Sequence, residues 1–504
     1  MLTRGCRPPM EAGDAAHQLR RVFLGIDCGT QSTKALILDG DSSAQTLSVG
    51  SSAHDLIERP DGTREQHPDW WVAALVDAVG QAVGAAGAVE VAGIGVSGQQ
   101  HGLVCLDAND RPTRAAKLWN DTTTEHDCNV LTERLGGIQA VLALTGNAFL
   151  PGYTAPKISW LRRMEPETYR STTRMCLPHD FLNHWLTGEF VTEPGDASGT
   201  AYFDVRSRRY RTEVLNALDP DRNWTTALPA VVESLSAIGG LTPAAAGALK
   251  LAAGIPVSAG GGDNMCAALG TGATRAGPVI VSLGTSGTAF SYSPMPALDP
   301  LGEAAAFCDS SNAWLPLACT LNAGDAADWI RDLFDIGHDE LDAVLTRAQP
   351  GARGLSFLPY LNGERTPSYP GGSGVFAGLR HWHSRDDLVR AVIEGVTFGL
   401  DYALGALRRS GIEPTEVRLV GGGARSDAWG QLCADIFGMP ISRPVVTESA
   451  ALGAALQARR VVDGVDFPSD VESTRTWEPE PNEELKAAAV RFDHLRKAAI
   501  ASRL

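Results

Sequence analysis

The chain has 504 residues, 44% of them hydrophobic and 20% charged, which suits a globular protein of two or three domains. Its formal net charge of -16 excludes a general binder of nucleic acids or anionic membranes, because phosphate-rich surfaces select basic proteins. An anionic ligand would therefore need a local site built from backbone groups.

The sequence also indicates where the protein is located and whether its cysteines are reduced. No stretch approaches the roughly 20 consecutive apolar residues of a membrane span, and the first residues contain no apolar signal core. We therefore expect a cytoplasmic protein without a membrane partner. The nine cysteines are scattered, with no CxxC pair and no metal-like spacing, which predicts reduced thiols. Residues 1–21 are predicted to be a flexible extension, because Pro8, Pro9 and Gly13 interrupt any periodic pattern.

The first predicted element is a β-hairpin with a polar turn. An apolar strand at residues 22–27 ends in Asp27, and a second strand is predicted at residues 34–38. A carboxylate at a strand end, beside backbone amides and hydroxyls, suits a Mg²⁺–phosphate group. An ordinary hairpin turn has the same pattern, so the motif needs support from elsewhere in the chain. The turn residues that could face a phosphate are Thr30, Gln31 and Ser32.

A further strand, predicted at residues 91–96 after a helix near residues 70–83, ends in amide and imidazole side chains. These belong to Gln100 and His101, which are neutral donors and acceptors suited to sugar hydroxyls. A lone histidine is more often structural or exposed. The neighbouring glutamines favour a polyol site instead.

Trp119 and Asp121 form the next polar motif, in which an aromatic face lies near a carboxylate. This combination is frequent in carbohydrate-binding sites. A core tryptophan followed by a turn would have the same sequence. Both interpretations stay open on these residues alone.

Asp263 follows three glycines near the middle of the chain. A short strand from residue 254 leads into the glycines, which let a ligand approach the backbone closely, and a small-residue helix is predicted from Met265. In phosphoryl transfer a carboxylate at such a place accepts the proton of the attacking hydroxyl. The alternative is that Asp263 only caps the helix.

Residues 279–288 repeat the pattern of the first hairpin, with an apolar strand, a turn at Gly284 and Thr285, and a second strand. The two copies lie about half a chain apart, which predicts an internal duplication of a phosphate loop. This pairing favours a functional role for the turn after Asp27.

A third glycine-rich corner, Gly421 to Ala424, lies between a strand at residues 417–420 and a helix at residues 427–437. Strand, glycines and helix make a corner compatible with phosphate or adenosine. No P-loop lysine follows it, so a P-loop kinase is not expected.

At these residues the sequence resembles the FGGY carbohydrate kinases, relatives of actin, hexokinase and the chaperone ATPases. The similarity runs from about residue 22 to about residue 460. Two long and specific signatures carry it. They are GYTAPKISWL at residues 152–161, and GVFAGL at residues 374–379 leading to DLVRAVIE at residues 387–394.

The resemblance implies an α/β fold with two actin-like (ribonuclease H-like) ATPase domains around an interdomain cleft. The implied division is a sugar-binding domain at residues 22–262 and a nucleotide-binding domain at residues 263–460. The polar, proline-bearing residues 461–504, with a final helix at residues 482–497, are predicted to be a peripheral tail. Closure of the cleft would exclude water, which competes with the sugar for the phosphoryl group. A homodimer is suggested by the family alone.

Within the family, the residues are most similar to members that phosphorylate D-xylulose. The implied reaction converts D-xylulose and ATP to D-xylulose 5-phosphate and ADP, with Mg²⁺ as cofactor. The resemblance makes Asp263 the general base and Asp27 a second catalytic acid, and both are candidate metal ligands. The implied sugar-binding residues are Gln100, His101, Trp119, Asp121, Asp263 and Asn264. The implied nucleotide-binding residues are Thr30, Gln31, Ser32, Gly284, Thr285, Gly422, Gly423 and Ala424.

One position departs from the family pattern, because Thr123 stands where many of these kinases have an arginine. Loss of a guanidinium changes charge and hydrogen bonding together, so sugar affinity or preference among pentuloses could shift. A kinase for another ketose or polyol, such as ribulose, therefore stays open. So does a non-catalytic sugar-binding protein on the same scaffold.

Overall fold

The computed structural model describes residues 19–41, 45–446 and 448–502. Residues 1–18 of the predicted extension lie outside the described residues. Arg20 and Arg21, which the predicted extension includes, instead begin strand β1 (Arg20–Cys28) and pair with residues 89 and 90. The first strand therefore starts two residues earlier than predicted.

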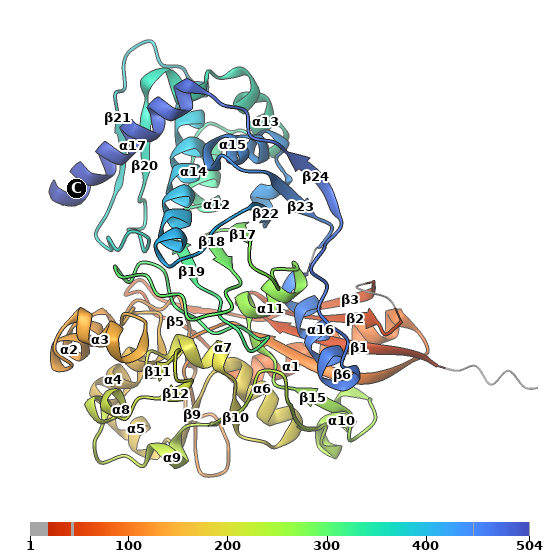
Figure 1. The fold of residues 1–504 in the computed structure, drawn as a ribbon. Helices are drawn as coiled ribbons and strands as arrows, with labels where there is room; N and C mark the ends of the chain where they lie inside the picture. Colours follow the sequence, from red (N-terminus) through yellow and green to blue (C-terminus); the bar gives the residue numbers. More distant parts are fainter. Residues whose placement is uncertain (1–18, 42–44, 447, 503–504) are drawn as a thin grey trace, which may run out of the picture.

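Two mixed β-sheets form the centre of the molecule, one in each half of the chain (Figure 1). The strands of the first sheet are β1, β2 (Ser32–Asp39), β3 (Thr46–Ala53), β6 (Val89–Gly98), β14 (Ala237–Gly240), β15 (Pro256–Ser258) and β16 (Gly261–Gly262). Their order is β14-β15-β6-β1-β2-β3, and β16 also pairs with β6. β1 is antiparallel to β2 and parallel to β6, and β2 is antiparallel to β3.

The second sheet has the same plan. Its strands are β17 (Pro278–Leu283), β18 (Gly287–Ser291), β19 (Leu317–Thr320), β22 (Glu416–Val420), β23 (Ile441–Pro444) and β24 (Ser473–Trp477). They lie in the order β19-β18-β17-β22-β23-β24. As in the first sheet, an antiparallel meander of three strands is followed by a strand parallel to its first member. The repeated order confirms the internal duplication predicted from the two hairpin turns.

Helices cover both faces of the first sheet. α1 (Pro68–Ala86), α6 (Pro178–Thr187) and α10 (Pro243–Leu249) share one apolar core with this sheet. α1 buries Trp71, Leu75 and Val79 at helical spacing and has a proline in its first turn, where no amide partner is lost. On the other face, α16 (Ser449–Asp463) packs on β1 and β6, and α11 (Asp263–Gly270) packs against α16.

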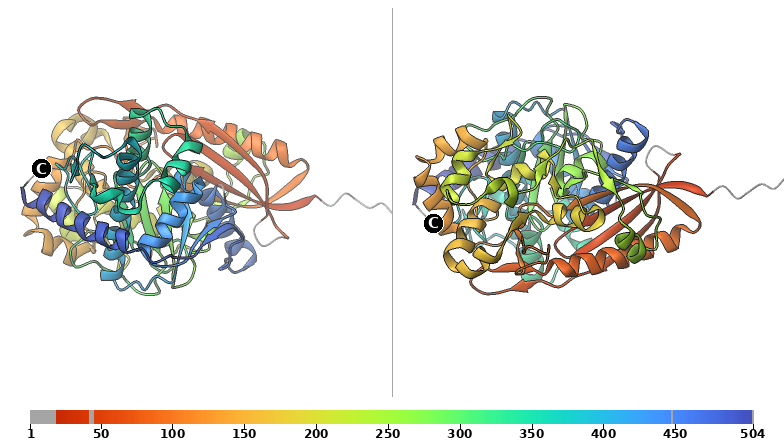
Figure 2. Two further views of the ribbon diagram at one scale, coloured as in Figure 1. Left: turned by 90° about the horizontal axis from the view of Figure 1, so that it is seen from above. Right: turned by 90° about the horizontal axis from the view of Figure 1, so that it is seen from below.

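A group of short helices gathers at one end of the first domain, beside the main sheet (Figures 1 and 2). They are α2 (Glu125–Arg134), α3 (Ile138–Thr145), α4 (Thr154–Met164), α5 (Pro166–Ser171), α7 (Pro194–Ala197), α8 (Thr212–Leu218) and α9 (Trp224–Ala227). The first domain also contains small strands that pair among themselves in separate sheets: β4 (Ile57–Glu58), β5 (Arg64–Gln66), β7 (Val104–Leu106), β8 (Ala116–Lys117), β9 (Arg174–Cys176), β10 (Val191–Thr192), β11 (Phe203–Asp204), β12 (Arg209–Tyr210) and β13 (Ala230–Val231).

The second domain is built around α14 (Arg385–Arg409). Ser384 and Asp387 form a capping box at its start, since each side chain bonds the other residue's main-chain N–H. The remaining elements are α12 (Gly324–Leu333), α13 (His338–Arg347), α15 (Asp427–Phe437), α17 (Glu483–Ser502), β20 (Ser356–Pro359) and β21 (Gly374–Ala377). The helix predicted at residues 427–437 is therefore confirmed.

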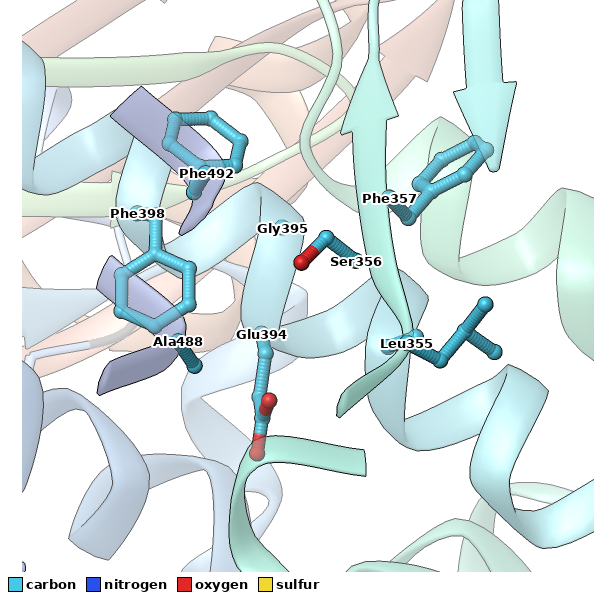
Figure 3. A pocket seen from close by; sticks show the side chains of 9 residues that line it. Leu355, Ser356, Phe357, Glu394, Gly395, Phe398, Ala488 and Phe492 are labelled. Atoms are coloured by element: carbon cyan, nitrogen blue, oxygen red, sulfur yellow. The ribbon is translucent and has the colours of Figure 1, made fainter. Parts of the chain in front are cut away.

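The C-terminal segment is more than the predicted peripheral tail. β24 is the edge strand of the second sheet, and Trp477 at its end is 4% exposed within the core. α17 packs on β20 and α14, where Phe492 meets Phe398 (Figure 3). The small gap between these elements is too narrow to hold a water molecule, so it is a packing seam and not a ligand site. The sequence did not reveal that this segment belongs to the second sheet, because the strand that ends at Trp477 is short and polar.

The connection from β18 to β19, residues 292–316, crosses to the first domain. Ala306 N donates to Asn147 Oδ1 at 2.8 Å, and Asn147 Nδ2 donates back to Ala306 O at 3.1 Å. Cys308 N donates to Ser198 Oγ at 3.0 Å. The two halves of the chain are therefore joined well away from their covalent link.

None of the helices in the described part of the chain is long and apolar enough to cross a membrane. The eight cysteines that the structure describes are all buried and free, as predicted. The ninth, Cys6, lies outside the described residues.

Candidate active site

The register of three parallel strands brings the two predicted catalytic acids to one edge of the first sheet. Asp27 of β1 lies opposite Ser97 of β6, and Gly261 of β16 lies opposite the same serine. Asp263 follows two residues later, at the start of α11. Because these strands are parallel, their carboxyl ends meet at the edge where ligands of α/β proteins bind.

Asp27 is partly buried and is held by one side chain. Ser97 Oγ donates to Asp27 Oδ1 at 2.7 Å. Burial raises the pKa of Asp27 to about 6, although the Ser97 hydrogen bond and the nearby Lys34 ammonium lower it. Lys34 Nζ is itself paired with Glu448, just before α16, at 2.6 Å. Lys34 was not predicted, because its partner lies more than 400 residues away.

Asp263 is the first helical residue of α11, and Gly262 is the N-cap. The helix starts two residues earlier than predicted, so the alternative role of Asp263 as a helix cap is wrong. Its Oδ1 accepts hydrogen bonds from Asn264 N and Nδ2, at 2.7 and 2.9 Å. Burial and the neighbouring Asp27 raise the pKa of Asp263 to about 7. A carboxyl group with that pKa can gain and lose a proton near neutral pH.

Gln100 joins this acid through Asn264. Asn264 Nδ2 donates to Gln100 Oε1 at 3.0 Å. Gln100 Nε2 is buried and has no hydrogen-bond partner in the described part of the chain. Since buried polar groups are almost always paired, this amide favours a ligand acceptor beside Asp263.

His101 is buried next to Gln100 in a left-handed backbone conformation, with φ at 66°. Lys157 Nζ and Thr154 Oγ1 hold this conformation by donating to His101 O, at 2.7 and 3.1 Å. The ring packs on Tyr153, with centroids 4.6 Å apart. Burial, followed by Lys157 and Arg365, lowers the pKa of His101 well below its usual value. The imidazole is therefore neutral and can both donate and accept.

Trp119 and Asp121 have different roles. Trp119 Nε1 donates to Thr30 Oγ1 at 2.9 Å, which ties the predicted sugar motif to the hairpin turn. Asp121 has no exposed surface. Its carboxylate accepts from Lys117 Nζ at 2.7 Å, and from Thr123 N and Oγ1 at 3.0 and 2.6 Å. The acid orients the segment that carries Trp119, and its position gives no support to the predicted direct sugar contact.

The three predicted residues of the first hairpin turn differ in exposure and in hydrogen bonding. Thr30 Oγ1 donates to Gln99 Oε1 at 3.2 Å, in addition to accepting from Trp119. Gln31 is exposed at the tip of the turn, and Ser32 begins β2. The turn is thus anchored to the sugar side at Thr30 and open at Gln31.

The predicted nucleotide residues from the second half of the chain lie at the corresponding edge of the second sheet, apart from Thr30, Gln31 and Ser32, which belong to the first. β17 and β22 are parallel neighbours, so the turns that follow them are adjacent. Gly421 has φ of 90°, and a Cβ there would lie 2.7 Å from the Leu283 carbonyl group, so no other residue fits easily. Gly284 O accepts from Gly324 N, at the start of α12, at 2.8 Å. Thr285 is exposed beside this contact.

The sequence suggested that the glycine corner leads directly into a helix, but in the structure a short turn lies between them. Gly422, Gly423 and Ala424 belong to a 3-10 turn (Gly422–Arg425). Ser426 then caps α15, accepting from Trp429 N at 3.0 Å. Gly422 is exposed with open space around it, whereas Ala424 is 3% exposed and belongs to the core. A nucleotide here would meet the turn and not a free helix terminus.

Asp27 and Asp263 fit a divalent cation. Each uses Oδ1 for its protein hydrogen bond, and neither Oδ2 accepts one from the described residues. Carboxylate oxygens are the donors that Mg²⁺ prefers. The charge of Asp27, which raises the pKa of Asp263, would be offset by such an ion.

Gln457 of α16 supports Asp263 from the side of the second sheet and is not among the predicted residues. Its Oε1 accepts from Ser258 Oγ and Gly260 N, at 2.8 and 2.7 Å. Its Nε2 donates to Gly260 O at 2.8 Å. The side chain is fully buried and fixes the strand end that leads to Asp263. No local pattern marks a single glutamine in an alanine-rich helix.

A buried His179 gives the same strand end a second support. Its Nδ1 lies 3.2 and 3.3 Å from oxygens of Asp180 and Asp196. Burial would lower the pKa of His179, but these two acids raise it well above its usual value. The ring's Nε2 lies 2.6 Å from Ala259 O. A protonated imidazole forms ion pairs with both acids, which offsets part of their buried charge.

Paired acids at the edge of one sheet and glycine-rich turns at the edge of its duplicate suit a phosphotransferase with the actin-like fold. The chain belongs to the FGGY family of carbohydrate kinases. The N-terminal domain of that family matches residues 22–270, and the C-terminal domain matches residues 279–461. The predicted resemblance and fold are confirmed. The family's first domain includes α11, whereas the predicted boundary falls before it.

Relatives and solved structures agree with this assignment over nearly the whole chain. A xylulose kinase of Haemophilus influenzae is 43% identical over 87% of this chain and 90% of its own. The crystal structure of a xyloylose kinase from Brucella ovis has a TM-score of 0.88 at 33% identity, covering 95% of this chain and 99% of that one. A gluconate kinase structure from Lactobacillus acidophilus also has a TM-score of 0.88, at 25% identity, covering 96% and 99%.

Proposed function

We propose that this carbohydrate kinase transfers the γ-phosphoryl group of ATP to D-xylulose, giving D-xylulose 5-phosphate and ADP. The site observation that carries the proposal is Asp263, with a pKa near 7, beside the unpaired amide of Gln100 and the neutral His101. The xylulose kinases similar to this chain support the choice of sugar. The reaction would take place in the cytoplasm, as the sequence predicts.

The steps follow from the placement of these groups. Gln100 Nε2 and the His101 ring hold sugar hydroxyls so that one faces the free Oδ2 of Asp263. Asp263 accepts the proton of that hydroxyl as its oxygen bonds to the γ-phosphorus and the bond to the β-phosphate oxygen breaks. Gly422 and the turn at Gly284 and Thr285 bind the nucleotide across from the acids.

The paired acids complete the catalytic group. Mg²⁺ would be held by Asp27 beside Asp263, and it would neutralise charge on the phosphoryl oxygens when bound. Ser97 keeps the Asp27 carboxylate in place through the 2.7 Å hydrogen bond to Oδ1. The side chain of Trp119 closes the sugar side and positions Thr30.

A substrate panel with ADP release as readout tests the choice of sugar. D-xylulose should give the highest kcat/KM among D-xylulose, ribulose, gluconate and glycerol. The similarity to a gluconate kinase makes gluconate the most informative competitor. Much faster turnover of any rival sugar would overturn the specific assignment while leaving the kinase chemistry intact.

The Asp263→Asn variant tests the base. The substitution keeps shape and hydrogen bonding but removes the proton acceptor, so turnover should fall about 100- to 10,000-fold. Sugar binding, measured by calorimetry, should persist. Asp221→Asn, at an exposed loop position, is the matched control and should stay fully active. Sugar binding without sugar-dependent ADP release in the unmodified enzyme would instead support the non-catalytic alternative.

A further inference from the structure

Arg365 reaches from the second domain to the sugar side of the first. It lies in the loop between β20 and β21, which pair with each other near the far end of the second domain (Figure 1). Yet a Cβ placed on Gly152, at the start of the first family signature, would lie 3.7 Å from Arg365 Nη2. The same Cβ would lie 2.2 Å from Trp119 O, so the guanidinium is close to the sugar-side tryptophan as well.

The base of this arginine is fixed by a buried acid. Glu364 is 3% exposed, and its Oε1 accepts from Leu321 N and Arg365 N, each at 2.7 Å. Its Oε2 accepts from Asn322 Nδ2 at 3.2 Å. Thr366 Oγ1 donates to Glu303 O at 3.1 Å on the other side. The main chain at Arg365 is therefore held in place on both sides.

The guanidinium has no acidic partner. Some buried arginines are paired with acids, as Arg114 is with Glu65 at 2.6 Å and Arg390 is with Glu394 at 2.7 Å, whereas the partly buried Arg208 and Arg222 donate to main-chain carbonyls. For the partly buried Arg365, no carboxylate of residues 19–41, 45–446 and 448–502 lies within ion-pair distance. A cation removed from water without a partner is unfavourable, so this position favours a ligand that supplies oxygen atoms.

The surroundings of Arg365 are those of the sugar site. Its charge contributes to the lowered pKa of His101 and opposes the raised pKa of Tyr153. The other cation nearby, Lys157, is already used, since Nζ donates to His101 O and Gly152 O at 2.7 and 2.6 Å. Arg365 is thus the cation that remains available on this side of His101.

We propose that Arg365 is a sugar-binding residue contributed by the second domain, which donates to the oxygens at the end of the ketose remote from the phosphorylated hydroxyl. Asp263, Asn264 and Gln100 are joined by hydrogen bonds, Gln100 precedes His101 in the chain, and Arg365 lies close enough to His101 to act on its charge. The fork of a guanidinium matches two adjacent oxygens, such as a carbonyl and the neighbouring hydroxyl. The inference rests on the proposed sugar kinase function.

This arrangement has a consequence for specificity. Thr123, where many related kinases carry an arginine, is bonded to Asp121 and offers no charge. Arg365 would supply a guanidinium to the sugar from the second domain. A sugar held by His101 on one side and Arg365 on the other connects the two domains, so sugar binding and domain approach are coupled.

Arg365→Gln and Arg365→Lys test the proposal, with Arg380→Gln as the matched control on an exposed turn. Loss of a charged hydrogen-bonding group should raise the KM for D-xylulose about 10- to 100-fold. The KM for ATP and the Tm should change little, and lysine should restore part of the affinity. Xylitol, which lacks the carbonyl, should be affected less than D-xylulose. Calorimetric titration of D-xylulose into each variant gives the same comparison without turnover.

The outcomes separate this inference from the proposed function. If the unmodified enzyme binds and phosphorylates D-xylulose and Arg365→Gln leaves its KM unchanged, the inference alone fails. A raised KM for ATP with an unchanged sugar KM would assign Arg365 to the nucleotide side and also overturn it. A large fall in Tm with equal losses for both substrates would make the residue structural. If no sugar binds the unmodified enzyme, both proposals fail.

Discussion

At the scale of single residues, the site depends on carboxyl groups in buried positions, where the ionised form is unfavourable. Asp27 and Asp263 lie at neighbouring strand ends because β1 and β16 both pair in register with β6. Burial raises the pKa of both groups, and for Asp263 the proximity of Asp27 adds to it. Perturbed carboxyl groups of this kind cluster at catalytic sites, because a base is most effective when its pKa lies near the working pH.

The raised pKa of Asp263 predicts the acid side of the pH–rate profile. The base works only when ionised, so kcat/KM for the sugar should be constant above its pKa, which is about 7 without a bound cation and lower when Mg²⁺ lies beside it. Below that pH it should fall about tenfold for each pH unit. Initial rates between pH 5 and pH 9, in buffers of one ionic strength, measure the profile. A limb near pH 4 would indicate an unperturbed carboxylate, or another group as base.

The residues that the sequence predicts are those marked by a local pattern. Asp27, Gln100 and Asp263 lie at or just after strand ends and beside glycine or amide runs, and the structure brings them together. Gln457 and Arg365 could not be found this way, because each acts through contacts with segments far away in the sequence. Asp121 shows the reverse case, since a polar residue in a sugar-like motif turned out to be buried against Lys117.

At the scale of elements, α16 has the position with the largest effect on the site. It follows β23 of the second sheet but packs on β1 and β6 of the first. The approach is close enough that a Cβ on Gly25 or Gly95 would lie about 2 Å from a carbonyl oxygen of α16, against Ala451 and Ala454. This contact carries Gln457 to the strand end before Asp263.

Gly453→Ala tests how tightly these elements are fitted. A Cβ at Gly453 would lie 1.7 Å from Cys266 O, so α11 must move away from α16. The free energy of unfolding should fall by about 3 kcal/mol or more, which exceeds the gain of about 1 kcal/mol from helix propensity. Because α11 begins with Asp263, kcat should fall as well. Urea unfolding and initial rates at saturating substrate measure the two effects.

Gly405→Ala provides the matched control within α14. Nothing lies within 4 Å of a Cβ at that position, so the substitution should leave stability unchanged or raise it slightly through helix propensity. Equal losses in both variants would mean that the spacing between α11 and α16 is not the cause.

Single helices and strands could be predicted from local sequence patterns, but their positions in the fold could not. The helix at residues 427–437 and the strands on either side of both hairpin turns follow from apolar periodicity and turn residues. The alanine-rich sequence of α16 gives no sign of which sheet it covers. The strand that ends in Trp477 is polar and short, so its pairing with β23 depends on a partner that the local sequence does not reveal.

At the scale of the whole molecule, the duplicated sheets are not independent units. α16, encoded with the second domain, covers Phe23, Leu36 and Leu38 of the first sheet. Residues 292–316 cross in the same direction and bond to Asn147 and Ser198. The second half of the chain therefore supplies α16 and residues 292–316 to the first half, and this exchange of elements joins the two halves.

This exchange predicts that the first domain does not fold by itself. A fragment of residues 19–270 would expose the apolar face that α16 covers and would lose the Gln457 contacts to Gly260. We expect it to unfold without a cooperative transition and to bind a dye that detects exposed apolar surface. The same fragment joined through a glycine–serine linker to residues 446–465 should regain a cooperative transition in circular dichroism, because the linker supplies the missing helix at high effective concentration. Sharp, reversible unfolding of the short fragment alone would show that the sheet and its other helices suffice, and that α16 matters for placing Asp263 and not for the stability of the domain.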